Sequence, residues 1–286
     1  MKCENILIIG APRSGTNMLR DMLAKLPKVG TWPCDEINYI WRHGNVRYPS
    51  DEFTREMATP DVKRYIRAQF DRFAKSQQLD VVVEKTCANS LRVGFVDAVL
   101  PDAKFIFIVR DGVDVVGSAA LRWKASLDIP YLMAKARYVP IADLPYYATK
   151  YLSSHLYRLV SKEKRLSSWG PKLNNMEAIV KNHSLLQVCA LQWKACVNRS
   201  KEELSKIDPE RVIKVKYEEL VARPGDEFMR IAKFLGREVA PDVLNEVIQS
   251  VAIGSVGKGR ATLGTSGLAE ILPLVNETLA VHGYKV

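Results

Sequence analysis

The stretch Ile6-Leu7-Ile8-Ile9-Gly10-Ala11-Pro12-Arg13-Ser14-Gly15-Thr16 decides the fold of this chain of 286 residues. It begins as an apolar run and ends in a glycine-containing turn. A helix is predicted directly after the turn by one apolar stripe, Met18, Leu19, Met22, Leu23 and Leu26. A turn between a strand and a helix gathers backbone N–H groups at the helix N-terminus, where the helix dipole also favours an anion. The stretch therefore predicts a phosphate-binding loop.

The loop differs from the ATP- and GTP-binding loop G-x-x-x-x-G-K-[ST], which requires lysine after its second glycine. Thr16 occupies that position here, and the cation of the turn is Arg13. The segment Pro12-Arg13-Ser14-Gly15-Thr16 resembles the 5′-phosphosulfate loop of sulfotransferases, which use 3′-phosphoadenosine 5′-phosphosulfate (PAPS) as the sulfuryl donor. The residues that this resemblance assigns to the 5′-phosphosulfate are Arg13, Ser14, Gly15, Thr16 and Asn17.

The length and hydropathy of the chain favour one globular unit. With 47% hydrophobic residues the chain can bury a full core, and we expect a single domain over 1–286. No stretch approaches the ~20 apolar residues of a membrane span, and the first apolar run is too short for the core of a signal peptide. We therefore expect no transmembrane segment and a cytoplasmic location.

The cysteine pattern argues against a metal ligand, and the net charge argues for an anionic one. The five cysteines are odd in number and lack C-x-x-C spacing, so neither a disulfide framework nor a zinc site is predicted, and we expect no metal. The net charge of +10 indicates an anionic partner. Because the positive residues are dispersed and no nucleic-acid motif is present, we expect a nucleotide rather than nucleic acid. The pattern makes no prediction of oligomeric state.

Four short β-rich runs, at 5–9, 81–84, 104–109 and 211–216, are separated by longer helical patterns. This alternation predicts a parallel sheet with helices on both faces. The strongest runs are continuously apolar, as is typical of strands that are covered on both sides. The fold class expected is therefore a P-loop-like, three-layer α/β fold.

The region 125–206 carries no strand signal and is rich in aromatic residues, among them Tyr146, Tyr147, Tyr151 and Tyr157. We interpret it as a helical insertion on the sheet. Such an insertion is a natural wall or lid for an acceptor substrate.

A second anion pocket is predicted after the run at 104–109. Arg110 follows that run, and Ser118 and Arg122 are four residues apart, hence on one face of the next helix. Arg110 and Ser118 resemble the 3′-phosphate site of sulfotransferases, and Arg122 falls where protein-tyrosine sulfotransferases have a further arginine. The resemblance implies that the three residues bind the 3′-phosphate of the nucleotide. Asp111 is the alternative partner of Arg110, which would give that arginine a structural role.

The segment Glu84-Lys85-Thr86-Cys87-Ala88-Asn89 resembles the E-K-T-x-x-N segment of carbohydrate and bacterial sulfotransferases. The resemblance makes Lys85 a catalytic residue that stabilises charge on the bridging oxygen as the leaving group departs. The alternative is a solvated lysine at a strand end.

The loop that contains Asp35 and Glu36 resembles the loop in which tyrosylprotein and other Golgi-type sulfotransferases carry a catalytic glutamate, and Glu36 matches that position. A hydroxyl acceptor must lose its proton as it attacks sulfur, and a carboxylate within hydrogen-bond reach can take it. Asp35 and His43 are rival bases.

Two further segments match the family. Lys216-Tyr217-Glu218 resembles its K-Y-E strand end, and 254–260 resembles the glycine-rich basic segment that closes over the nucleotide. The residues that these matches add to the nucleotide site are Tyr217, Lys258, Gly259 and Arg260.

Together these segments resemble PAPS-dependent sulfotransferases of the bacterial or Golgi type, either carbohydrate or tyrosylprotein enzymes. The resemblance implies transfer of a sulfuryl group from PAPS to an acceptor hydroxyl on a glycan, lipid, peptide tyrosine or small alcohol, with release of 3′-phosphoadenosine 5′-phosphate (PAP). The alternatives are a small-molecule kinase with an altered loop and a non-catalytic nucleotide-binding or nucleic-acid-binding protein.

Overall fold

The structure is a computed structural model that describes the chain except for residues 1–2, 124–136, 148, 150–168, 253 and 286. Its described residues form a five-stranded sheet of order β2-β3-β1-β4-β5, with every neighbouring pair parallel. The strands are β1 (Glu4–Ile9), β2 (Val29–Gly30), β3 (Val81–Glu84), β4 (Lys104–Val109) and β5 (Val212–Lys216). The predicted parallel sheet is confirmed. β2 was not predicted, because two residues are too short to show a period.

The order of the strands fixes where a ligand can bind. β1 lies at the centre, between β3 and β4. The carboxyl ends of these three strands therefore meet at one edge of the sheet, which is where open α/β sheets bind their ligands. The loop after β1, the segment after β3 and the turn after β4 all leave from this edge.

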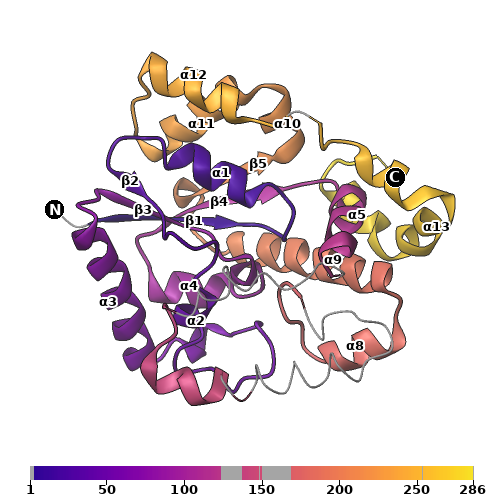
Figure 1. Ribbon diagram of the computed structural model, residues 1–286, viewed down its shortest axis with the longest axis horizontal. Helices are drawn as coiled ribbons and strands as arrows, with labels where there is room; N and C mark the ends of the chain where they lie inside the picture. The colour runs from indigo at the N-terminus through magenta and orange to yellow at the C-terminus, as the bar shows by residue number, and fades with distance from the viewer. Residues whose placement is uncertain (1–2, 124–136, 148, 150–168, 253, 286) are drawn as a thin grey trace.

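Helices cover both faces of the sheet (Figure 1). One face carries α1 (Thr16–Leu23), α10 (Tyr217–Ala222), α11 (Pro224–Leu235) and α12 (Pro241–Ser250). The other face carries α3 (Pro60–Ser76), α4 (Val93–Val99) and α9 (Leu185–Leu204). At one side α5 (Gly112–Trp123) packs against α9 and against α13 (Lys258–Val281). The short elements are α2 (Asn38–Trp41), α8 (Met176–Asn182), η1 (Arg55–Met57), η2 (Cys87–Leu91), η3 (Ile141–Asp143) and η4 (Pro209–Arg211).

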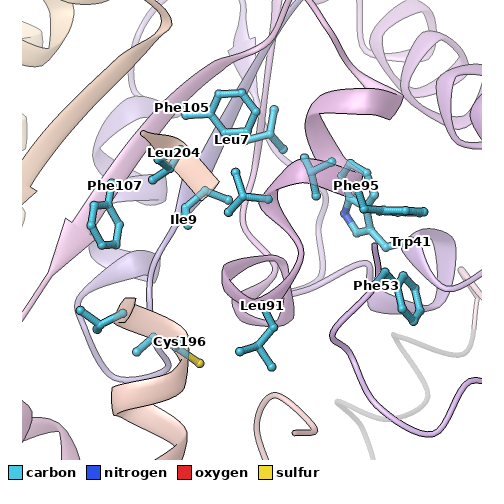
Figure 2. Packing of buried hydrophobic residues seen from close by; sticks show 14 of the residues in the cluster. Leu7, Ile9, Trp41, Phe53, Leu91, Phe95, Phe105, Phe107, Cys196 and Leu204 are labelled. Carbon is cyan, nitrogen blue, oxygen red and sulfur yellow. The ribbon is translucent and has the colours of Figure 1, made fainter. Parts of the chain in front are cut away.

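Successive side chains along each strand point to opposite faces of the sheet, and each face therefore has its own hydrophobic core. Leu7 and Ile9 of β1 point into the cluster that also holds Phe105, while Ile6 and Ile8 point into the cluster beneath α1. Figure 2 shows the first cluster, in which Trp41 and Phe95 lie beside the residues of the sheet. Because each face of the sheet has its own apolar cluster, the three-layer architecture predicted from the sequence is confirmed.

Within the predicted insertion at 125–206, α9 is a core helix. Its Trp193 and Cys196 are buried, and burial raises the pKa of the Cys196 thiol to about 12. This part of the region is thus a layer of the fold. Tyr151 and Tyr157 lie outside the described residues, and the role of the remainder as an acceptor wall stays a prediction. In the part of the chain that the structure describes, no helix has both the length and the apolar character needed to span a bilayer.

Candidate active site

The loop after β1 presents the N-terminus of α1 to the ligand edge of the sheet. Gly15 caps α1 with a φ of 85°, and no side chain caps the helix. A Cβ atom on Gly15 would lie 2.3 Å from the ring of Tyr217, so glycine is required both for the turn and for the approach of Tyr217. The first backbone N–H groups of α1 lack intrahelical partners and face the loop. This arrangement suits an anion.

A cavity of about 1260 Å³ opens at this edge of the sheet. It joins the loop, the segment after β3, the turn after β4 and the start of α13. The predicted site residues that line it are Arg13, Gly15, Thr16, Asn17, Glu36, Lys85, Arg110, Ser118, Arg122, Tyr217, Lys258 and Gly259. The sequence therefore singled out residues from six separate segments that the fold brings together at this cavity.

Three arginines, Arg13, Arg110 and Arg122, gather at one end of the cavity. Arg110 Nη1 donates to the Arg13 carbonyl oxygen at 3.1 Å, and Arg13 Nε donates to Ser118 Oγ at 2.9 Å. Burial, and then the charges of Arg122 and Arg110, lower the pKa of Arg13. A cluster of like charges is unfavourable without an anion between them, so these residues form a site for a multiply charged anion.

Asp114 of α5 fastens the start of α13 to this end of the cavity. Its carboxylate accepts hydrogen bonds from the backbone N–H groups of Gly257 at 2.8 Å and Gly259 at 2.6 Å, and it lies 3.4 Å from Arg110 Nη2. A Cβ atom on Gly259 would lie 2.4 Å from the Asp114 Cα atom, so the two segments touch backbone to backbone. The sequence analysis missed Asp114. Its spacing of four residues from Arg110, across the start of the helix, was the available signal.

Two predicted nucleotide residues do not line the cavity. Ser14 is fully buried beneath the loop, and among the described residues its hydroxyl has no hydrogen-bond partner. Arg260 Nη2 instead donates to the Lys285 carbonyl oxygen at 2.8 Å. The helical turn at the start of α13 directs Lys258 and Gly259 toward the cavity and Arg260 toward the C-terminal residues.

Lys85 and Glu36 form an ion pair where β3 ends. Lys85 Nζ lies 3.3 Å from Glu36 Oε1, and the backbone N–H of Cys87 donates to the same oxygen at 3.2 Å. The Lys85 side chain is 3% exposed and that of Glu36 is 25% exposed. Burial opposes the charged ammonium, but the neighbouring acidic groups, including Glu36 and Asp35, outweigh it and raise the pKa of Lys85. Lys85 is therefore a buried cation at the cavity wall, not a solvated lysine.

The rival bases lie in different surroundings. Asp35 lines the cavity but pairs with Arg20 at 3.0 Å and accepts from Asn17 at 3.1 Å. Burial favours its neutral form, yet the charges of Lys85 and Arg20 prevail and lower the pKa of Asp35. His43 does not line the cavity, and its Nδ1 lies 2.8 Å from Asp143.

The cavity wall also contains residues that were not predicted to belong to the site. Among them are Met18, Asn38, Tyr39 and Trp169. Gln192 Nε2 donates to the Trp169 carbonyl oxygen at 2.8 Å and so anchors this segment to α9. Met18, predicted to lie on the apolar stripe of the helix, is in the first turn of α1 and also lines the cavity. Among the described residues, no group of three or more His, Cys, Asp or Glu side chains is arranged to hold a metal ion.

Comparison with known proteins identifies the family. The model of the sulfotransferase family matches residues 5–164 and 155–241, and the chain belongs to this family. The fold is that of solved sulfotransferases. The sulfotransferase domain from the curacin biosynthetic pathway is 14% identical with a TM-score of 0.57, covering 100% of this chain and 99% of that chain. The sulfotransferase domain from the Synechococcus PCC 7002 olefin synthase is 17% identical with a TM-score of 0.54, covering 100% and 97%.

Mouse sulfotransferase SULT7A1, solved as a complex with PAP, is 14% identical with a TM-score of 0.52, covering 98% of this chain and 86% of that chain. No curated protein matches the chain significantly in sequence.

Proposed function

We propose that the protein transfers a sulfuryl group from PAPS to an acceptor hydroxyl and releases PAP. The observation that carries the proposal is the position of the Lys85–Glu36 pair in the same cavity as the arginine cluster formed by Arg13, Arg110 and Arg122. The nucleotide end of the cavity has the charge for a bisphosphorylated nucleotide. The other end has an acid–base pair for the transfer. The complex of the related mouse fold with PAP supports the choice of nucleotide.

At the nucleotide end, Arg110, Ser118 and Arg122 hold the 3′-phosphate. Arg110 is fixed in its orientation by the Tyr217 ring, 4.4 Å from its guanidinium carbon to the ring centroid. The backbone N–H groups at the start of α1, together with Arg13, hold the 5′-phosphosulfate. Lys258 closes the site from the start of α13, where Asp114 fastens the backbone.

The chemical step forms one bond and breaks another at sulfur. The acceptor oxygen attacks sulfur in line while the bond from sulfur to the bridging oxygen breaks, and the electron pair of that bond passes to the 5′-phosphate of PAP. Lys85 donates a hydrogen bond to the bridging oxygen and stabilises the charge that develops there. Glu36 takes the proton of the attacking hydroxyl.

The surroundings of the three acidic or basic candidates support Glu36 as the base. His43 is engaged with Asp143 away from the cavity, and Asp35 is held in its ionised form by two cations. Glu36 lies beside Lys85, so the group that takes the proton and the group that stabilises the leaving oxygen face the same reacting atoms.

The nucleotide is tested by thermal unfolding with PAP, AMP and ATP with Mg²⁺. Ligands that bind the native state raise the melting temperature by mass action, and we expect PAP to raise it most because only PAP carries a 3′-phosphate. Equal shifts with PAP and AMP would contradict the 3′-phosphate site. A larger shift with ATP and Mg²⁺ would indicate a kinase.

The reaction and the acceptor are tested with PAPS labelled with sulfur-35. The screen offers glycans, lipids, tyrosine peptides and small alcohols, and we expect the label to move to a hydroxyl of one of these classes. A chain that binds PAP tightly but transfers label to none of them, and releases no labelled sulfate to water, is a nucleotide-binding protein without this activity.

A further inference from the structure

Glu84, at the end of β3, is a buried carboxylate outside the chemistry proposed above. Its exposed fraction is 2%, and it does not line the cavity. Charged side chains are seldom buried without a partner, because removing a carboxylate from water costs several kcal/mol. Each of its two oxygens accepts a hydrogen bond from a different side chain, one from Thr86 and the other from Asn89. Each of these side chains begins a separate series of hydrogen bonds, which we call a path.

The first path runs from Glu84 through Thr86 to the loop of Glu36. The Thr86 hydroxyl donates to Glu84 Oε1 at 2.5 Å, and the backbone N–H of Ile37 donates to Thr86 Oγ1 at 3.2 Å. Because the hydroxyl gives its proton to Glu84, its lone pairs face Ile37. The path ends one residue after Glu36.

The second path runs through Asn89 of η2 and Arg92, the residue that precedes α4, to Asn38 of α2. Asn89 Nδ2 donates to Glu84 Oε2 at 3.0 Å, Arg92 Nε donates to Asn89 Oδ1 at 2.9 Å, and Arg92 Nη2 donates to Asn38 Oδ1 at 2.5 Å. Asn89 and Arg92 have no measurable exposure. The path ends two residues after Glu36.

Glu36 itself is held from the other side by the same segment. Lys85 and the backbone N–H of Cys87, the first and third residues after Glu84, both donate to Glu36 Oε1. The segment after β3 thus contacts Glu36 directly and, through Glu84, fixes the next two residues of its chain.

We infer that Glu84 is a positioning residue, which sets the place of Glu36 relative to Lys85 by fixing Ile37 and Asn38. This inference rests on the proposed function, in which Glu36 is the base. It requires an acceptor of two hydrogen bonds at position 84. Glutamine has nearly the same shape but only one accepting oxygen. If that oxygen accepts from Asn89, the amide group of the glutamine faces Thr86, whose hydroxyl must then accept and can no longer donate to position 84. Asn89 cannot turn its amide over without losing the bond from Arg92.

The first experiment compares Glu84→Gln with the wild-type protein, using the acceptor found by the labelled screen or, failing that, water as the acceptor in PAPS hydrolysis. We expect turnover to fall about 10- to 100-fold, since a misplacement of about 1 Å in a catalytic group can cost that much. The Kd for PAP should stay within about twofold, because no contact of Glu84 reaches the nucleotide end. A crystal structure of the variant should show Glu36 moved away from Lys85.

A double-mutant cycle separates positioning from general damage. If Glu84 acts through Glu36, the variant Glu36→Gln/Glu84→Gln should be no slower than Glu36→Gln alone. If the fold-losses in turnover of the two single variants multiply in the double variant, the inference is wrong. It is also wrong if Glu84→Gln keeps full turnover while Glu36→Gln is inactive. If Glu36→Gln itself keeps full turnover, the proposed base is wrong, and positioning of that base is wrong with it.

A second pair of variants tests the first path if Glu84→Gln does not fold. Thr86→Val removes the hydroxyl and should lower turnover, whereas Thr86→Ser keeps the hydroxyl and should restore it. Thr278→Val is the matched control, since Thr278 is equally buried and also accepts a hydrogen bond, from Asn198, far from the cavity. A loss of turnover in the control equal to that in Thr86→Val would show general destabilisation and contradict the inference.

Discussion

The Lys85–Glu36 pair after β3 and the Arg110–Asp114 pair after β4 are built from the same parts and differ in what their carboxylates do. In each, a buried cation follows a strand at the ligand edge of the sheet. Asp114 is 3% exposed, and its oxygens accept the backbone N–H groups of Gly257 and Gly259. Glu36 is 25% exposed and reaches its lysine from a separate loop. Burial and backbone bonds make one carboxylate structural, and partial exposure leaves the other accessible to substrate.

The largest expected effect comes from removing the accessible carboxylate. Glu36→Gln should lower turnover by about 10²–10⁴, the usual contribution of a positioned general base, with the Kd for PAP nearly unchanged. Label transfer from PAPS under single-turnover conditions measures the first quantity, and calorimetric titration with PAP measures the second. Asp35→Asn and His43→Asn are the controls. A variant His43→Asn that folds but is inactive, beside an active Glu36→Gln, would make His43 the base.

Removing the structural carboxylate should act on folding instead. Asp114→Ala leaves Arg110 buried without its carboxylate and two backbone N–H groups without an acceptor, so the free energy of unfolding should fall by about 3–5 kcal/mol. Urea unfolding measures the change. Glu246→Ala is the control, since it breaks an exposed pair with Lys25 and should cost no more than about 1 kcal/mol. Similar losses in the two variants would mean that Asp114 does not fasten α13.

Local patterns in the sequence were sufficient for every strand except the two-residue β2, and residues that they singled out in several segments line the cavity. The runs at β1, β3 and β4 are continuously apolar, and site residues were predicted directly after β3 and β4. Lys85 and Arg110 illustrate this, since both follow a strand and both line the cavity.

Contacts between distant segments were not predictable in the same way. No role was predicted for Asp114, because its partners Gly257 and Gly259 are more than 140 residues away. Arg260 was assigned to the nucleotide by its motif, but the turn of α13 directs it to Lys285. A motif gives the residues of a segment, whereas the direction of each side chain depends on the helix that the segment joins.

Glu84 extends the comparison to a third carboxylate, which is as buried as Asp114 but is hydrogen-bonded by the neutral side chains of Thr86 and Asn89. Burial is the main reason why the pKa of Glu84 is raised to about 7 from 4.5; Glu36 raises it further, whereas Thr86 and Lys85 oppose the shift. Between these two pH values the native state therefore holds a proton that the unfolded chain has released, and the arrangement in which both Glu84 oxygens accept hydrogen bonds is complete only once this proton leaves. Stability should fall as the pH rises from about 4.5 to 7, by roughly 3 kcal/mol, and then level off.

The measurement is urea unfolding at pH 5 and at pH 7.5 for the wild-type protein and for Glu84→Gln. Because glutamine does not titrate, the wild-type protein should lose stability relative to the variant over this range, while other titrating groups cancel in the comparison. Parallel pH profiles would show that Glu84 is ionised throughout and that its hydrogen-bond donors stabilise the charge.

The smallest expected effect concerns the cation of the structural pair. Arg110 contacts the Arg13 carbonyl, the Ser255 carbonyl and the Tyr217 ring, and these contacts fix its guanidinium at the cavity wall, beside the proposed 3′-phosphate site. Arg110→Ala should weaken PAP binding by about 1.5–3 kcal/mol, the range for a hydrogen bond to a charged group. AMP, which lacks the 3′-phosphate, should bind the variant and the wild-type protein almost equally. If PAP and AMP lose the same affinity, Arg110 supports the loop through its backbone contacts and does not bind the 3′-phosphate. The Arg110–Asp114 pair would then be structural in both of its members, whereas in the Lys85–Glu36 pair both members are proposed to act on the substrate.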